Sequence, residues 1–554
     1  MKKLLALLAA CSLSVAFAAP FAEEIKKGDN CAPPPSALAP TLPAKILPGM
    51  GTVHFPMTTS SPEAQQFFDQ GVAQMHSFWA REAERSFLQA AALDPSAPMP
   101  WWGVSMVASG DYRPRFQLDL QQETFGKSVP PSLARARAAA EKATLLSQVP
   151  GKASDLEKMY IAAISARRNA ASKDPDEDFV KATRALLAKH PDEVEAQLYL
   201  TLAIMRGFSE TDRKPLAQGS TEAVTILRAL AVKYPEHPGV HHYIIHAFEG
   251  SSFAKDAWPS CEKYSQLVTN IPHALHMPGH IYAQTGKWDE AMKSFSDAAV
   301  NERGWMKLDK MYGDGHHGHN VHYLATTYSF TGRYDDAMEA AKELLTFKEN
   351  PAQAASLDNF STAYAQGWFA LMRTNVQFEK WDVILDEKTL IPFSRPRQEA
   401  WRHWARSIAW ANKGDVTAAN GEMHQFEQSL VEFTAKTKRP APADLAVARQ
   451  ELAAHLEIAK GNIDKGLKLF DVASKAERRL TYSEPAYYPR PAAEMMGKIA
   501  LRHNKPAVAE RAFKVALGQY PGDSHAQNGL RAAIEIQRLD AGKKSSAASS
   551  GAAE

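Results

Sequence analysis

The histidines of this chain are concentrated in one stretch, and their spacing is the feature that could do chemistry. Of 19 histidines, eleven lie between His237 and His322. Three segments hold most of them: His-His-Tyr-Ile-Ile-His at 241–246, His-Ala-Leu-His-Met-Pro-Gly-His at 273–280, and His-His-Gly-His-Asn-Val-His at 316–322. Residues three or four apart share one face of a helix. Each segment therefore predicts a stripe of imidazoles on one helix.

The stripes keep a fixed register along the chain. The first and second are 34 residues apart, and the second and third are 46 apart. An insertion of twelve residues around Trp305 to Gly315 accounts for the difference. Neighbouring helices pack about 8–10 Å apart, so imidazoles on successive stripes can share one ion. We therefore predict a concave groove lined by these candidate metal ligands: His242, His246, Glu249, His273, His276, His280, His319 and His322.

Imidazole combined with carboxylate favours transition metals over calcium or magnesium. We expect zinc, copper or iron, with nickel also compatible with this ligand set. Two alternatives remain open, namely a hydrogen-bonded anion or peptide site and a pH-responsive cluster.

The other histidines fit this pattern less well. His241 points about 100° away from its stripe, His316 and His317 fall in the predicted insertion loop, and His237 belongs to a turn before Pro238. The remaining histidines are scattered, and we assign them no role: His54, His76, His190, His403, His424, His455, His503 and His525.

A repeated pattern of small and large residues identifies the elements that must position the stripes. The first copy consists of Phe67, Gly71, Ala83, Phe87, Ala90 and the Leu-Asp-Pro at 93–95. Further copies run through Gly279, Ala325 and Gly497. Small residues let two antiparallel helices approach closely, an aromatic ring fills the adjacent space, and proline ends the second helix. The pattern is that of tetratricopeptide repeats, so we predict an all-α protein, an α-solenoid of roughly eight to ten helix pairs.

The sequence predicts six segments along the chain. They are a signal peptide at 1–18, an extended Pro-rich segment at 19–60, N-terminal repeats at 61–236, His-rich central repeats at 237–345, C-terminal repeats at 346–539 and a disordered tail at 540–554. The tail prediction rests on its content of Ser, Ala and Gly.

The N-terminus carries the marks of export. A basic start at 1–3 precedes an apolar stretch at 4–15 and the small-x-small sequence Ala-Phe-Ala at 16–18. This pattern predicts a cleaved signal peptide and a periplasmic or secreted protein. A second interpretation is a lipobox ending at Cys11, which would give an outer-membrane lipoprotein with a lipid anchor. In an oxidising compartment Cys31 and Cys261 form either a disulfide or two separate thiols.

Charge and motif content exclude several classes of function. The 554 residues contain 64 Lys plus Arg and 62 Asp plus Glu, and this balance argues against a nucleic-acid partner. No other stretch has the apolar length of a membrane-spanning helix. The sequence lacks a Gly-rich phosphate loop, a His-Glu-x-x-His motif and a Gly-x-Ser-x-Gly elbow.

Several motifs resemble a group of exported bacterial tetratricopeptide-repeat proteins whose function is poorly defined. They are the segments 81–87, 93–95, 102–103, 237–247, 276–282 and 319–324, and the loop with Glu484-Pro485 and Pro489-Arg490. Phe-Trp-Ala at 78–80 departs from the Phe-Asn-His usual in that group. The resemblance implies an exported helical-repeat protein and brings no settled activity.

Three functions are consistent with the sequence. The first is a binding protein whose groove holds a transition metal or a metal-dependent ligand and whose surface docks a protein or peptide. The second is a metal-dependent hydrolase or oxidoreductase in which Glu249 assists an open coordination position. The third is a metal-free interaction scaffold of the cell envelope. We rank the binding protein first because solenoids act most often by binding.

Overall fold

A computed structural model describes residues 43–115, 117–118, 132–207, 219–309, 315–349, 362–393, 395–480 and 482–550, together with residues 40 and 312. The predicted signal peptide, Cys11 and Cys31 lie outside these residues, so export, lipidation and the disulfide stay predictions. Cys261 is buried, and within the described residues it forms no disulfide. Within the described ranges, no helix has the length and apolar character needed to cross a membrane.

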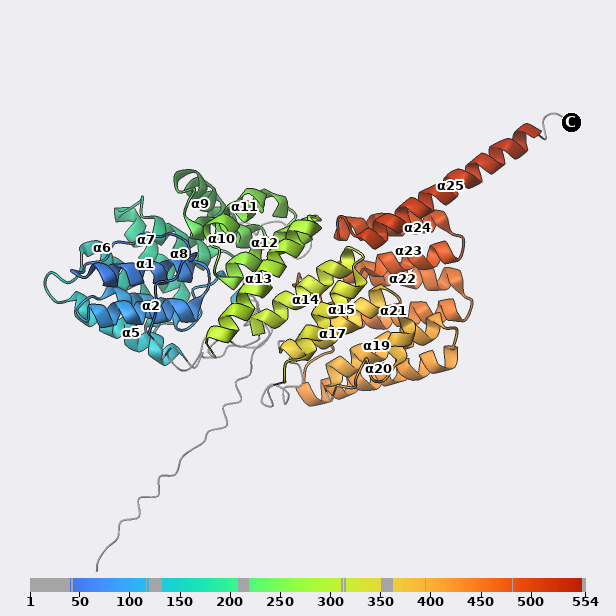
Figure 1. Cartoon of the computed structure of the whole chain (residues 1–554), viewed down its shortest axis with the longest axis horizontal. Helices are drawn as coiled ribbons and strands as arrows, with labels where there is room; N and C mark the ends of the chain where they lie inside the picture. Colours follow the sequence, from blue (N-terminus) through green and yellow to red (C-terminus); the bar gives the residue numbers. More distant parts are fainter. Residues whose placement is uncertain are drawn as a thin grey trace, which may run out of the picture.

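All regular secondary structure in the described part of the chain is helical, with no strand (Figure 1). The N-terminal helices are α1 (Pro62–His76), α2 (Ala80–Leu93), α3 (Met99–Val107), α5 (Leu133–Ser147), α6 (Asp155–Arg168), α7 (Pro175–Lys189), α8 (Val194–Ile204) and α9 (Gly219–Lys233). The central elements are α10 (Pro238–Phe248), the 3-10 turn η1 (Ala254–Ala257), α11 (Trp258–Leu267), α12 (Pro272–Thr285), α13 (Trp288–Leu308), α14 (Gly315–Phe330) and α15 (Tyr334–Leu345). The C-terminal helices are α17 (Ala363–Gln377), α18 (Trp381–Leu385), α19 (Pro396–Asn412), α20 (Val416–Thr437), α21 (Ala443–Ala459), α22 (Ile463–Glu477), α23 (Ala492–Arg502), α24 (Pro506–Gln519) and α25 (Ser524–Ser550).

Successive helices pack in pairs through the predicted contacts between glycine and phenylalanine. A Cβ atom at Gly71 would lie 2.6 Å from the ring of Phe87, and one at Gly279 would lie 2.5 Å from the ring of Phe295. The same contact recurs at Gly497, where the separation would be 2.7 Å. Only glycine leaves room for the aromatic ring at these crossings. The fold is an α-solenoid of tetratricopeptide-type helix pairs, as the sequence predicts.

The histidine-bearing helices α10 and α12 have sequence-encoded ends. Each has proline at its start, Pro238 and Pro272, where the fixed φ angle suits a helix and the missing N–H costs nothing. Gly286 ends α12 with a φ of 83°, in the left-handed region that favours glycine. These signals fix the phase of both helices and therefore the face on which their histidines lie.

The C-terminal repeats fold back onto the central ones. The Trp288 indole N–H donates to the Pro521 carbonyl oxygen at 2.8 Å, and the His525 ring lies 3.0 Å from the Ser329 carbonyl oxygen. Figure 1 shows α12 to α15 lying between the N-terminal helices and the C-terminal ones. The centre of the solenoid is therefore covered from both sides.

Two local features differ from the sequence prediction. The helix α13 continues to Leu308 and α14 begins at Gly315, so His316 and His317 are helical residues and not part of a loop. The helix α25 continues to Ser550, through most of the predicted disordered tail, and projects beyond the neighbouring pairs (Figure 1). Alanine and lysine in this segment favour continuation of a helix once it has begun.

The described part of the Pro-rich segment, residues 43–60, has neither helix nor strand, but it is packed. Val53 and Phe55 are buried, and the Phe55 ring contacts Phe68 and Trp102 with centroids 5.7 Å from each. The segment therefore forms part of the N-terminal core.

Candidate metal centre

The three stripes lie on the first helices of three successive pairs, α10, α12 and α14. Every predicted histidine is buried, with no more than 4% of its surface exposed. The histidines predicted to line a concave groove are therefore covered by other parts of the chain. The turn between α1 and α2 covers one side of the histidines, and the loop between α22 and α23 covers another.

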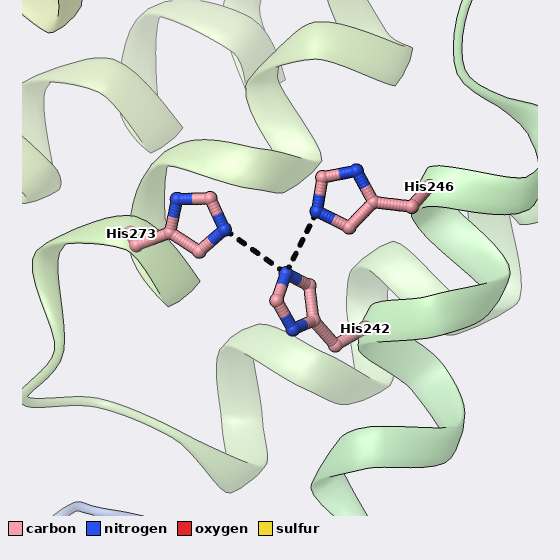
Figure 2. A group of neighbouring side chains, drawn as sticks. All are labelled: His242, His246 and His273. Carbon is pink, nitrogen blue, oxygen red and sulfur yellow. Dashed lines mark hydrogen bonds between the residues drawn. The ribbon is translucent and has the colours of Figure 1, made fainter. Parts of the chain in front are cut away.

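His242, His246 and His273 converge on one point (Figure 2). The Nε2 atom of His242 lies 3.0 Å from Nε2 of His273 and 3.1 Å from Nε2 of His246. Nitrogen ligands about 2.0–2.1 Å from a tetrahedral metal ion are about 3.3 Å apart. We call these three residues the first trio.

The outer nitrogens of the first trio identify which atoms carry protons. His242 Nδ1 lies 2.5 Å from the His76 carbonyl oxygen, and His246 Nδ1 lies 3.0 Å from Oε2 of Glu249. Both oxygens are acceptors, and the one facing His246 is nearer than the Gln117 amide nitrogen at 3.5 Å, so both Nδ1 atoms carry the hydrogen. A neutral ring then has a lone pair on Nε2. Two lone pairs facing each other across 3.1 Å repel unless a cation lies between them.

Phe78 closes the remaining face of the first trio. Its ring centroid lies 4.5 Å from that of His242, 5.2 Å from His246 and 5.5 Å from His273. Phe78 is fully buried and adopts a φ of 52°, in the left-handed region that phenylalanine rarely occupies. Such strain persists only where the surrounding structure imposes it, and here it aims an apolar ring at the imidazoles.

His276, His280 and His319 form a second trio, on α12 and α14. Nε2 of His276 lies 3.0 Å from Nε2 of His319 and 2.5 Å from Nε2 of His280. The Asn320 amide group donates to the Phe295 carbonyl oxygen at 2.9 Å, so its oxygen faces His276 Nδ1 at 2.7 Å. His276 therefore carries its hydrogen on Nδ1 and directs a lone pair into the trio.

Burial decides the charge of most of these rings. It lowers the pKa of His242, His276 and His319 well below the ordinary value, and neighbouring imidazoles lower it further. Burial also lowers the pKa of His280, but the carboxylates of Glu484 and Glu249 outweigh it and raise the pKa to about 10. The surroundings of His280 thus call for one positive charge, which a proton or a metal ion can supply.

Glu249 links the two trios. Its Oε2 accepts from His246 Nδ1 of the first trio, and its Oε1 accepts from His280 Nδ1 of the second at 2.6 Å. The sequence predicts Glu249 as a metal ligand; its two oxygens face the outer nitrogens of the two trios, and it also forms, with His280 and Glu484, a group that could hold a metal ion. Carboxylates in this position orient metal-binding imidazoles and raise their basicity.

Glu484 was not among the predicted site residues. It comes from the loop between α22 and α23, about 200 residues beyond the trios along the chain. Its carboxyl group pairs with His280 Nδ1 and accepts from the Tyr482 hydroxyl. Burial raises the pKa of Glu484 well above its ordinary value, with a further rise from Glu249. In the sequence, Glu484 appears only in the Glu484-Pro485 loop, one of the motifs in which the chain resembles exported tetratricopeptide-repeat proteins.

His322 joins neither trio. Its Nδ1 pairs with Oε1 of Gln366, and its Nε2 lies 3.3 Å from Nη1 of Arg373. Burial, and then the Arg373 charge, lowers its pKa to about 3. An arginine at this position opposes a metal cation, so His322 serves packing between α14 and α17.

A third group consists of residues that were not among the predicted ligands. His76 Nε2 lies 2.6 Å from Oε2 of Glu195, and His237 Nε2 lies 3.0 Å from Oε1 of the same carboxylate. His76 Nδ1 also pairs with the Tyr243 hydroxyl at 2.8 Å. Each carboxylate oxygen already has a histidine partner, so this group is best described as a hydrogen-bonded network. It holds His76, whose carbonyl oxygen orients His242.

Comparisons with known proteins bear on the fold only. No protein-family model matches the chain, and no curated sequence matches it. Among solved structures, it is similar to the APC/C hetero-tetramer Cut9–Hcn1, at 12% identity over 88% of this chain and 79% of that one, with a TM-score of 0.29. It is similar to yeast Tom70, at 11% identity over 87% and 90% with a TM-score of 0.26, and to the P58(IPK) TPR domain, at 12% identity over 86% and 99% with a TM-score of 0.22.

Proposed function

We propose that this tetratricopeptide-repeat protein binds transition-metal ions at the two histidine trios. One observation carries the proposal. In each trio, Nε2 atoms converge while the Nδ1 atoms of two members face oxygen acceptors. In the first trio, hydrogen bonds alone do not account for the contact between His242 and His246, because both rings direct an Nδ1 hydrogen at an oxygen and, when neutral, have none left to place between their Nε2 atoms. A bound cation satisfies all three lone pairs of a trio.

The donor atoms favour zinc or copper. Imidazole nitrogen suits zinc, copper, iron and nickel, whereas non-haem iron usually takes two histidines and one carboxylate. The two nearest carboxylates, Glu249 and Glu484, face Nδ1 atoms and so support the ligands from outside. We therefore propose that imidazole nitrogens alone supply the protein ligands of each metal ion.

Burial favours retention of the metal over turnover. The six imidazoles are at most 2% exposed, and Phe78 covers the first trio. Catalysis by a bound metal requires an open coordination position that a substrate can reach. We therefore place binding above the alternative of a hydrolase or oxidoreductase. The α-solenoid supports a protein-binding role for the outer surface, in the exported protein that the N-terminal sequence predicts.

Elemental analysis tests the proposal directly. The protein is exported and purified without a His tag or chelator, and its metals are counted by plasma mass spectrometry. We expect two equivalents in the wild type, one in His242→Ala and one in the double variant His276→Ala, His280→Ala. His403→Ala serves as the control, because His403 lies in α19 and pairs with Glu422 far from the trios along the chain. Wild-type protein that retains no metal and takes up neither zinc nor copper would refute the proposal.

A further inference from the structure

Asn320 connects the second trio to the packed centre of the preceding helix pair. It is fully buried on α14, directly after His319. Its amide NH2 group donates to the Phe295 carbonyl oxygen at 2.9 Å and to Oε2 of Glu302 at 3.3 Å. Both of these partners are acceptors, so turning the amide over would place its oxygen against two other oxygens. The amide oxygen therefore faces His276 Nδ1, at 2.7 Å.

Helix packing holds the two acceptors in place. Phe295 lies on α13, and its ring is the one that a Cβ atom at Gly279 would meet at 2.5 Å. Glu302 also lies on α13, is buried, and accepts from His317 Nδ1 at 2.9 Å. The orientation of the Asn320 amide therefore follows from the packing of α12, α13 and α14.

The amide oxygen decides which tautomer of His276 is favoured. A neutral imidazole carries its hydrogen on Nδ1 or on Nε2. An amide oxygen can only accept, so the 2.7 Å contact is a hydrogen bond only when Nδ1 carries the hydrogen. In the other tautomer, a lone pair on Nδ1 would face the oxygen, and the Nε2 hydrogen would lie where a metal ion must bind. The tautomer that binds metal through Nε2 is thus selected before an ion arrives.

The first trio obtains the same tautomer from the main chain. His242 Nδ1 faces the carbonyl oxygen of His76, 2.5 Å away. A main-chain carbonyl group remains when its side chain is replaced, whereas the amide of Asn320 is lost with its side chain. One substitution can therefore change the tautomer at the second trio and leave the first trio intact.

On the basis of the proposed function, we infer that Asn320 is a positioning residue of the second metal site, which keeps the hydrogen of His276 on Nδ1 and leaves Nε2 for the ion. Asn320 does not touch the ion and acts through His276. Outer partners of this kind fix the tautomer and the ring orientation of metal-binding histidines. Here an amide takes the place that Glu249 and the His76 carbonyl oxygen take at the rings of the first trio.

Nitrogen-15 NMR of the metal-free, full-length protein tests the inference directly. The spectrum of protein labelled at histidine distinguishes the two tautomers, and the His276→Ala variant identifies the signals of His276. We expect the Nδ1–H tautomer in the wild type. In Asn320→Leu, which keeps the size of the side chain and removes its oxygen, we expect the hydrogen on Nε2, because His319 Nε2 lies 3.0 Å away and can accept it. A residue that served packing alone would leave the tautomer unchanged.

Asn375→Leu is the matched control. Asn375 is 1% exposed on α17, and its amide group donates to the Leu371 carbonyl oxygen at 2.8 Å and accepts from the Tyr334 hydroxyl at 2.9 Å. Competition with a chromophoric chelator should show one zinc site weakened about 10- to 100-fold in Asn320→Leu, the range typical of outer-sphere changes. The control should keep both zinc affinities and the wild-type tautomer of His276.

A hydrogen on Nε2 of His276 in the wild type would overturn the inference, whether or not the variant folds. An unchanged tautomer, or two unchanged zinc affinities, in a folded Asn320→Leu protein would also overturn it. The tautomer is measured without metal. A wild type that binds neither zinc nor copper therefore refutes the proposed function itself, so the two failures are distinguishable.

Discussion

Replacing Glu249 by glutamine should weaken metal binding without removing any ligand. The carboxylate accepts from one imidazole of each trio, at 3.0 Å from His246 Nδ1 and 2.6 Å from His280 Nδ1. Glutamine has one oxygen and one NH2 group, so it can accept from only one of the two rings. Its NH2 group then faces the Nδ1 hydrogen of the other ring, either His246 or His280. That ring must move its hydrogen to Nε2, where it blocks the metal.

The expected magnitude follows from this geometry. Loss of an outer-sphere partner typically costs 10- to 100-fold in metal affinity, which corresponds to about 1.4–2.7 kcal/mol. Because Glu249 contacts both trios, one site should lose affinity in this range and the other should lose less. The change is small beside the loss of a ligand, and stoichiometry at saturating zinc should stay at two.

Chelator competition on the metal-free protein measures both affinities. Glu422→Gln is a matched control, since Glu422 accepts from His403 Nδ1 at 2.6 Å and also from Arg406, away from the trios. If Glu249→Gln binds two zinc ions with the affinities of the wild type and of Glu422→Gln, Glu249 does not support the ligands and the argument from outer nitrogens fails.

Three further outcomes are expected. Zinc loading at pH 7 should release about one proton from His280, whose pKa is raised to about 10. Calorimetry in buffers of different ionisation enthalpy measures the number of protons released. If none is released, the positive charge assigned to His280 is wrong. Gly279→Ala should destabilise the fold by about 1–3 kcal/mol because its Cβ would meet Phe295. By contrast, Gly421→Ala lies in open space on α20 and should stabilise the fold by up to about 1 kcal/mol. Thermal melts compare the two variants, and equal effects on stability would count against the packing argument. Burial raises the pKa of Glu477 from 4.5 to about 7, so between these pH values the folded carboxyl group keeps a proton that the unfolded chain loses. The free energy of unfolding should therefore fall by about 3 kcal/mol as pH rises from about 4.5 to about 7. Glu477→Gln should abolish this pH dependence in thermal melts taken across that range.

The helix pairs were predictable because their signals are local. Gly71 with Phe87, and Gly279 with Phe295, lie at fixed spacings within one repeat, and proline and glycine mark the helix ends. The boundary between α13 and α14 was not predictable, because residues 305–308 and 315–317 continue their helices without a distinctive cap. The helical structure of the C-terminal tail was not predictable either, because its composition suits both a solvated coil and a helix extended from a folded repeat.

The site was only partly predictable for a different reason. Periodicity identified the trios, since His242 and His246 share one helix face and the stripes repeat at one register. It could not identify Glu484 or Phe78, which reach the trios through loops from distant repeats. It also could not separate His322 from the members of the trios, because Arg373, which faces His322, lies on the next helix pair. Which segments cover the centre of a solenoid depends on how the whole superhelix curves, and no local sequence pattern encodes that curvature.

The trios also connect metal binding to the integrity of the solenoid. In the metal-free protein, the Nε2 lone pairs of His242 and His246 face each other across 3.1 Å without a hydrogen between them, and a buried polar contact left unsatisfied in this way costs about 1–3 kcal/mol. A bound ion removes this cost and adds about 4 kcal/mol of stability at a concentration of 1,000 times Kd. Chelation should therefore speed hydrogen exchange in α10, α12 and α14, and in the loop that carries Glu484, while α20 stays unchanged. Uniform exchange in both states would mean that metal does not hold these segments together, and the histidines would then be better explained as packing residues.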